Sequence, residues 1–137
     1  MNADKKKVKD FLYEDLTYEI RGAIFEVYNH LGSGHKEGVY HRALAGEFKR
    51  AGLAFEEEKS LEVVYKEERV GNYKPDFVVD DKVIVELKAL PVVTHESQKQ
   101  LAHYLKGTGY KLALLVNFGP KLEIIRRVYT DQRKSAI

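Results

Sequence analysis

The sequence contains no cysteine among its 137 residues. Disulfide bonds, a thiolate nucleophile, and zinc or iron–sulfur centres held by cysteine are therefore excluded. The sequence also lacks an apolar run long enough to span a membrane, and residues 1–10 lack the apolar segment of a signal peptide. We therefore expect a soluble protein that resides in the cytoplasm.

A large excess of one charge is also missing, because 23 Lys and Arg residues face 21 Asp and Glu residues, for a formal net charge of +2. This value neither indicates nor excludes a polyanionic partner, since local patches matter more than the sum. No glycine-rich phosphate loop and no Gly-x-Ser-x-Gly turn is present, which argues against a nucleoside triphosphatase and a serine hydrolase. The five histidines do not show the paired spacing of a zinc site.

The length and composition indicate one globular domain with its own core, since 44% of the residues are hydrophobic and 32% are charged. We expect a flexible N-terminal arm over residues 1–12, the folded domain over residues 13–129, and a flexible tail over residues 130–137.

Apolar periodicity predicts the secondary structure of that domain. Helices are expected at residues 16–31, 37–51 and 94–106, and strands at residues 61–65, on both sides of a turn within 72–90, and at 111–118 and 122–129. Two helices, three strands, a helix and two strands predict an α/β fold in which helices flank a mixed β-sheet.

Residues 72–90, NYKPDFVVDDKVIVELKAL, are the most informative segment. Asp76 lies on one predicted strand, whereas Glu86 and Lys88 lie two residues apart on the next and therefore share one face. They continue the apolar run of residues 83–85, which indicates a strand that is covered on both sides. Charged groups at this position are costly unless they meet each other, a metal or the sheet edge. Two carboxylates and an ammonium group there suit a divalent cation and a polarised water.

The turn between these strands decides whether the carboxylates meet. A two-residue loop at Asp80 and Asp81 pairs Asp76 with Val85 and places the carboxylates on opposite faces. A three-residue loop or a β-bulge pairs Asp76 with Glu86 instead. We therefore predict the irregular hairpin.

Pro75 and Asp76, followed by Glu86, Leu87 and Lys88, match both halves of the PD-(D/E)xK nuclease signature. The segment thus resembles this superfamily. The resemblance implies a single-domain, restriction-endonuclease-like fold.

Two further motifs agree with that resemblance in order and spacing. Residues 34–40, GHKEGVY, fit a GxxExxY pattern, and residues 100–104, QLAHY, fit the QxxxY pattern of RecB-like nucleases. From about residue 16 to residue 128, the chain looks like the GxxExxY family of small PD-(D/E)xK-like proteins.

The resemblance implies a nuclease that uses Mg²⁺ or Mn²⁺ to hydrolyse phosphodiester bonds in nucleic acid, with DNA favoured. Asp76, Glu86 and the backbone carbonyl of Leu87 are the expected metal ligands, because Mg²⁺ prefers oxygen donors and retains several waters. Lys88 is expected to stabilise negative charge on the attacking hydroxide and on the phosphate. The alternative is that these side chains form ordinary ion pairs at a strand end.

Glu37 has two interpretations, because it falls in the first turn of the second predicted helix. It either interacts with the helix dipole or, as the resemblance implies, serves as a third acidic catalytic group that binds or orients metal. Gly34 permits the tight turn before this helix. Tyr40 lies one turn after Glu37 and is expected to support the site by packing or hydrogen bonding.

Gln100 and Tyr104 lie four residues apart and therefore share one helix face. The resemblance implies that they face the active site, where they position Lys88 or contact the nucleic-acid backbone. The alternative is a surface glutamine and a half-buried tyrosine.

Two other functions remain open at this stage. The domain could be a non-catalytic module that binds nucleic acid or protein while keeping the nuclease fold. It could also act as a homo-oligomer or as a subunit of a larger complex through an apolar edge strand at residues 122–128.

Overall fold

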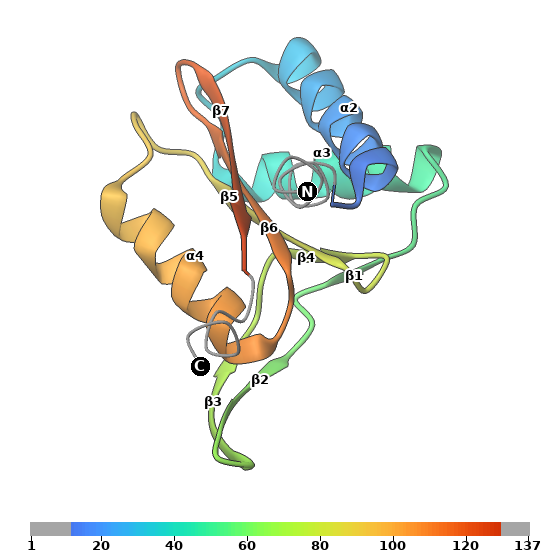
Figure 1. Cartoon of the computed structure of the whole chain (residues 1–137). Coiled ribbons are helices and arrows are strands. Elements are labelled where there is room, and N and C mark those ends of the chain that lie inside the picture. The colour runs from blue at the N-terminus through green and yellow to red at the C-terminus, as the bar shows by residue number, and fades with distance from the viewer. Residues whose placement is uncertain (1–11, 130–137) are drawn as a thin grey trace, which may run out of the picture.

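The computed structural model describes residues 12–129 (Figure 1). The predicted tail and residues 1–11 of the predicted arm lie outside the described residues. The helices are α2 (Glu14–Leu31), α3 (Glu37–Arg50) and α4 (His95–Thr108). The strands are β1 (Phe55–Glu57), β2 (Leu61–Tyr65), β3 (Glu68–Tyr73), β4 (Phe77–Val79), β5 (Val83–Lys88), β6 (Leu112–Phe118) and β7 (Leu122–Val128).

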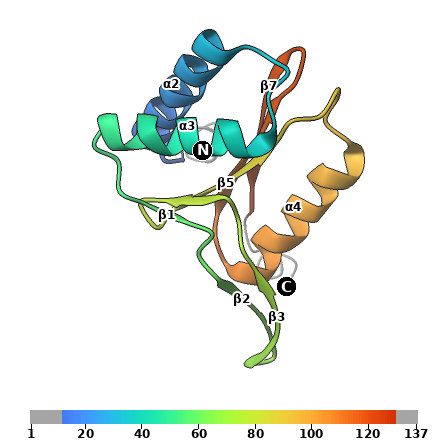
Figure 2. The same ribbon diagram turned by 180° about the vertical axis from the view of Figure 1, so that it is seen from behind.

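Five strands form a mixed sheet in the order β1-β4-β5-β6-β7. Strands β5 and β6 are parallel and are joined by a crossover through α4, whereas the other neighbours are antiparallel. Strands β2 and β3 form a separate two-stranded sheet, which extends beyond the rest of the domain (Figure 2).

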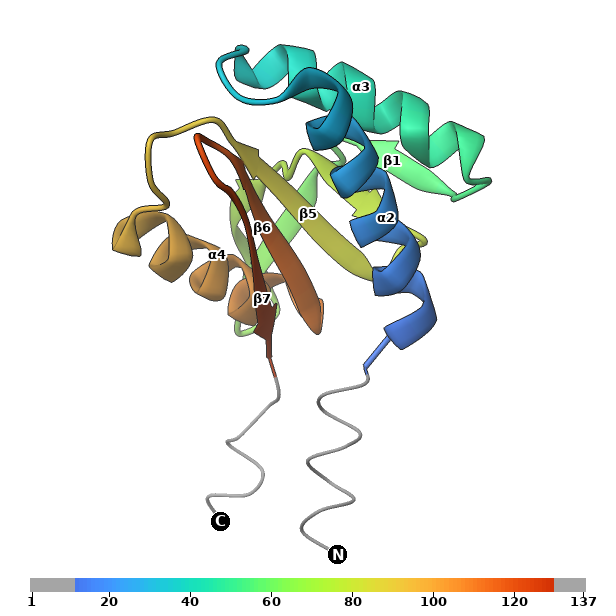
Figure 3. The same ribbon diagram turned by 90° about the horizontal axis from the view of Figure 1, so that it is seen from above.

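Helices cover both faces of the large sheet, with α2 and α3 on one side and α4 on the other (Figure 3). Each side has its own hydrophobic cluster, because alternate strand residues point to opposite faces. The first cluster includes Ile20, Ile24, Leu44, Phe48, Phe77, Val85 and Leu114. The second includes Leu61, Tyr73, Val78, Ile84, Leu101, Leu105 and Ala113. The predicted α/β fold, with a mixed sheet flanked by helices, is confirmed.

The predicted helices agree with the structure to within about two residues at each end. Gly32 ends α2 with a φ of 65°, a left-handed value that glycine adopts without steric cost. The Thr94 hydroxyl caps α4 by accepting a hydrogen bond from the Ser97 amide at 3.0 Å, as the sequence predicts. None of the helices described between residues 12 and 129 is long and apolar enough to cross a membrane.

The structure differs from the prediction between α3 and α4, where it has five strands instead of three. Strand β3 pairs with β2, and the chain then passes through Lys74 and Pro75 before joining the large sheet as β4. Because proline has no amide hydrogen to donate to a β-ladder, Pro75 favours this break. Asp76 therefore directly precedes a strand instead of lying within one.

The β4–β5 hairpin has the three-residue loop that the site requires. Val79 pairs with Val83, and residues 80–82 connect them. Asp80 and Asp81 both have a φ of 52°, a left-handed conformation that aspartate tolerates better than most residues. The predicted irregular hairpin is confirmed, and its register places Asp76 opposite Glu86.

Candidate active site

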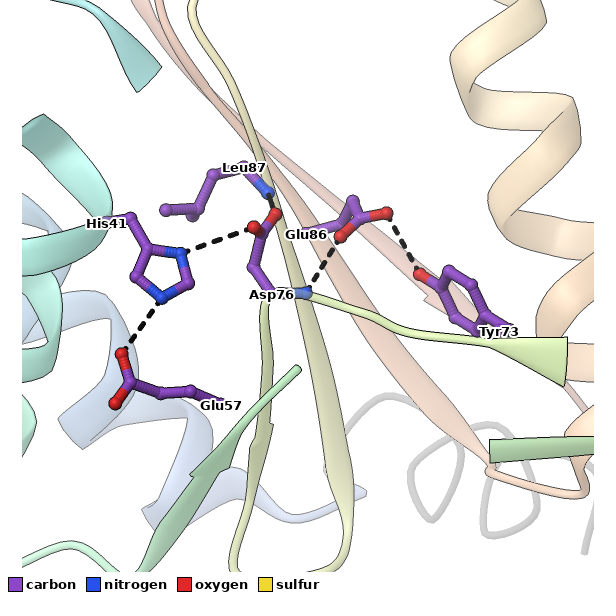
Figure 4. Close-up of polar contacts among 6 residues, drawn as sticks. All are labelled: His41, Glu57, Tyr73, Asp76, Glu86 and Leu87. Atoms are coloured by element: carbon purple, nitrogen blue, oxygen red, sulfur yellow. Dashed lines mark hydrogen bonds and ion pairs between the residues drawn. The ribbon is translucent and has the colours of Figure 1, made fainter. Parts of the chain in front are cut away.

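The structure brings Asp76 and Glu86 together at the open end of the β4–β5 hairpin, away from its loop (Figure 4). The backbone amide of Asp76 donates a hydrogen bond to Oε1 of Glu86 at 3.0 Å. Strand β5 continues from Val83, Ile84 and Val85, all fully buried, to the half-buried Glu86. The carboxylates therefore meet where the hydrophobic core gives way to the surface.

The Asp76 carboxylate is held from two sides. Its Oδ2 atom accepts a hydrogen bond from the Leu87 backbone amide at 2.8 Å, and its Oδ1 atom lies 3.3 Å from Nδ1 of His41. The side chain keeps 22% of its surface exposed. It is thus oriented by β5 and α3 but remains accessible.

Glu86 is held by an aromatic side chain. The Tyr73 hydroxyl donates to Oε2 of Glu86 at 3.1 Å. Burial raises the pKa of Glu86, and so do the hydrogen bond and negative charge of Asp76, whereas the Asp76 amide and the Tyr73 hydroxyl oppose this shift. Burial and the adjacent Glu86 also raise the pKa of Tyr73, which keeps this hydroxyl protonated as a donor.

Lys88 is the last residue of β5 and is half-buried. It shares a strand face with Glu86, because the two residues are separated by one position. Its positive charge lowers the pKa of Glu37, against the larger effects of burial and of Asp76, which raise it. Lys88 therefore shares its strand face with Glu86, one of the two carboxylates.

Glu37 is the first residue of α3 and lines a cleft of about 480 Å³ together with Asp76 and His41. Partial loss of hydration raises the pKa of Glu37, and the negative charge of Asp76 raises it further, against the opposing charges of Lys88 and His41. Glu37 thus lies within the electrostatic field of the site. The complete lining is Glu37, Gly38, His41, Arg42, Glu57, Glu58 and Asp76.

His41 is a site residue that the sequence interpretation missed. Its Nε2 atom lies 2.9 Å from Oε1 of Glu57, and its ring stacks on Phe77 with the ring centroids 4.4 Å apart. One signal could have indicated it, because His41 follows Glu37 by four residues and therefore shares its helix face. Tyr73 was also missed, since its position depends on the break at Pro75.

Gly34 and Tyr40 shape the loop before α3 and do not contact the two carboxylates. Gly34 has a φ of 100°. The fully buried Tyr40 donates to the Gly32 carbonyl at 2.6 Å, accepts from the His35 amide at 3.2 Å, and stacks on Phe118. Its contacts are those of a supporting residue.

The two residues of the QxxxY pattern have different environments. Tyr104 is half-buried and stacks on Tyr73, so it reaches Glu86 through one intervening side chain. Gln100 is exposed and lines a separate cavity of about 780 Å³ along α4, whose lining shares no residue with the cleft at Asp76. Of this pair, the structure connects only Tyr104 to the carboxylates.

The donor atoms fit a hard divalent cation that retains several waters. Within residues 12–129, no three acidic or histidine side chains form a ready-made metal centre. Mg²⁺ nevertheless needs few protein ligands, and Asp76, Glu86 and the Leu87 carbonyl offer the oxygen donors that it prefers. Each carboxylate oxygen has two acceptor positions, so the hydrogen bonds described above leave positions for a cation.

The comparison with curated protein sequences found no match. The crystal structure of an alkaline exonuclease from Laribacter hongkongensis is similar, with a TM-score of 0.48 and 15% sequence identity. That match covers 67% of this chain and 55% of the exonuclease chain. A family model described as the PD-(D/E)XK nuclease superfamily matches residues 14–128, which include both halves of the signature. The chain therefore belongs to the PD-(D/E)XK nuclease superfamily.

Proposed function

We propose that this protein is a Mg²⁺- or Mn²⁺-dependent nuclease that hydrolyses phosphodiester bonds in DNA. The observation that carries the proposal is the meeting of Asp76 and Glu86 at one strand end, and Lys88 follows on the same face of β5 as Glu86. Membership of the superfamily supports the nuclease activity, and the oxygen donors support the choice of cation. Within the superfamily, the pattern of Gly34, Glu37 and Tyr40 supports assignment to the GxxExxY family.

Asp76, Glu86 and the Leu87 carbonyl would hold the cation. When bound, a divalent cation lowers the pKa of water and stabilises negative charge on phosphoryl oxygens. The Leu87 amide orients Asp76 and the Tyr73 hydroxyl orients Glu86, so both carboxylates are arranged before a ligand arrives.

Lys88 would supply a positive charge on the face of β5 that carries Glu86. Its ammonium group stabilises the negative charge that develops on the phosphate as water attacks. Glu37 lines the cleft next to Asp76 and is proposed as the third acidic group, which orients water or a second cation.

The test is cleavage of supercoiled plasmid, linear duplex, single-stranded DNA and RNA in Mg²⁺ or Mn²⁺ by the wild type and by Lys88→Ala. We expect metal-dependent cutting of DNA that Lys88→Ala loses while it keeps its circular dichroism spectrum. Full activity in Lys88→Ala would contradict the assigned role of this residue. Binding of DNA without cutting under all conditions would instead support the non-catalytic module.

A further inference from the structure

Asp76 depends on contacts from other elements for its orientation, because it precedes β4 and is not part of that strand. The Leu87 amide fixes Oδ2 through a hydrogen bond of 2.8 Å. A single bond of this kind still lets the carboxylate plane tilt about the bonded oxygen. The Nδ1 atom of His41, 3.3 Å from Oδ1, is the contact that sets the direction of the second oxygen.

His41 is itself held in place by three elements. Its backbone belongs to α3, its Nε2 atom contacts Glu57 at the end of β1, and its ring stacks on Phe77 at the start of β4 with an angle of 23° between the planes. Only 17% of the side-chain surface is exposed. Figure 4 shows the imidazole between Glu57 and Asp76. A ring fixed in this way directs Nδ1 toward a single position of Oδ1.

We propose that His41 is a positioning residue that orients Asp76 for metal binding, with Glu57 holding the imidazole. The inference rests on the proposed function, because it takes Asp76 as a metal ligand. Hydrogen bonds to a metal ligand fix its orientation and tune the affinity for the metal. Because Oδ1 has a second acceptor position, it can take the bond from His41 and still face a cation.

Two substitutions separate the two contacts of the imidazole. The amide nitrogen of asparagine occupies about the position of Nδ1, and that of glutamine about the position of Nε2. His41→Asn therefore offers an amide donor to Asp76 and none to Glu57, whereas His41→Gln does the reverse. His41→Ala removes both contacts.

The measurement is the Mn²⁺ affinity of the full chain by isothermal titration calorimetry. We expect His41→Ala to weaken the affinity by about 10- to 100-fold, the range found when such supporting groups are removed. His41→Asn should recover most of this loss, and His41→Gln should not. In cleavage assays, raising the Mn²⁺ concentration should restore kcat in His41→Ala without changing KM for DNA, an effect that a loss of folding would not produce.

His30→Ala is the matched control. His30 also lies near a glutamate, with 3.3 Å between its Nδ1 atom and Oε1 of Glu26, but on the exposed surface of α2, so its removal should leave the affinity unchanged. Equal Mn²⁺ affinity in wild type, His41→Ala and His41→Asn would overturn the inference, as would a rescue by His41→Gln alone. Unchanged Mn²⁺ affinity in Asp76→Ala would instead overturn the proposed metal site.

Discussion

The rings of Tyr73 and Tyr104 lie parallel, with their centroids 3.7 Å apart and an angle of 2° between their planes. Tyr73 uses its hydroxyl to hold Glu86, and Tyr104 belongs to α4, the helix of the crossover between β5 and β6. The tyrosine of the QxxxY pattern thus acts on the site by supporting a second tyrosine. Contacts between aromatic rings of this kind contribute about 0.5–1.5 kcal/mol beyond the area that they bury.

Removing the Tyr73 hydroxyl should impair catalysis while leaving the fold intact. Tyr73→Phe keeps the stack on Tyr104 but leaves Oε2 of Glu86 without its donor, so we expect kcat to fall by about 10-fold, in the range of other supporting groups. Tyr104→Leu should also lower kcat because it removes the stack, and Tyr104→Phe should lower it much less. Steady-state cleavage of DNA measures all three.

Tyr110→Phe serves as the control for these variants, because the Tyr110 hydroxyl donates to Asp81 in the β4–β5 loop and not to either carboxylate. A Tyr104→Phe variant that loses as much activity as Tyr104→Leu would show that the Tyr104 hydroxyl itself contacts the substrate.

Divalent cations should stabilise the folded protein in a dose-dependent way. A ligand that binds only the folded state adds about 2.7 kcal/mol at roughly 100 times its Kd. We expect Mn²⁺ to raise the Tm of the wild type, EDTA to reverse the rise, and Asp76→Ala to abolish it. Differential scanning calorimetry measures the shift, and an identical rise in Asp76→Ala would place the cation elsewhere.

Glu86→Gln should stabilise the protein in EDTA at neutral pH. The pKa of Glu86 is 4.5 in the unfolded chain and is raised in the folded state, mainly by burial and then by Asp76. The folded protein therefore binds this proton more tightly, and the resulting stability is fully present below pH 4.5 and lost as pH rises through the folded pKa. Glutamine does not ionise, so Glu86→Gln avoids the loss of stability that deprotonation of Glu86 causes.

The difference in unfolding free energy between Glu86→Gln and wild type should therefore grow as pH increases. Urea denaturation in EDTA at several pH values measures it. A difference that stays constant with pH would show that Asp76 and burial do not disfavour the charged form of Glu86.

Asn117→Ala should destabilise the end of β5. Asn117 is fully buried, its Oδ1 atom accepts from the Leu90 amide at 2.8 Å, and its Nδ2 atom donates to the Leu90 carbonyl at 3.0 Å. The variant leaves both Leu90 groups without these partners, and we expect a loss of about 2–4 kcal/mol, since each buried unpaired group costs about 1–3 kcal/mol. Urea denaturation measures the change in unfolding free energy. A loss no larger than that of a substitution at an exposed site would show that the two hydrogen bonds to Leu90 do not stabilise the fold.

Gly107 is where α4 approaches the small β2–β3 sheet. A Cβ atom at this position would lie 2.8 Å from Cγ1 of Val63. Alanine normally stabilises a helix by about 1 kcal/mol relative to glycine, but overpacking of this kind costs about 1–3 kcal/mol. We therefore expect Gly107→Ala to be destabilising alone and tolerated together with Val63→Ala. Additive effects in this double-mutant cycle would refute the contact.

The sequence was most informative where local patterns decide the structure. The run Val83–Val85 indicated a strand buried on both faces, and all three residues are fully buried. The requirement that Asp76 and Glu86 meet predicted an irregular hairpin, and the loop has three residues. In both cases the side-chain period of a strand links residue number directly to direction in space.

Contacts between distant elements could not be predicted in the same way. His41 contacts Asp76 only because α3 packs over the end of β4, and Tyr73 contacts Glu86 only because the chain changes sheets at Pro75. Neither event leaves a periodic pattern in the sequence. Histidine and tyrosine at these positions look like ordinary surface or core residues until the packing is known.

The two carboxylates are anchored to different hydrophobic clusters. Asp76 is connected through His41 to Phe77 in the cluster under α2 and α3, whereas Glu86 is connected through Tyr73 to the cluster under α4. Any ligand that binds both carboxylates therefore acts as a cross-link between the two layers of the domain. Its occupancy should slow hydrogen exchange on both faces of the sheet at once, including amides far from the cleft.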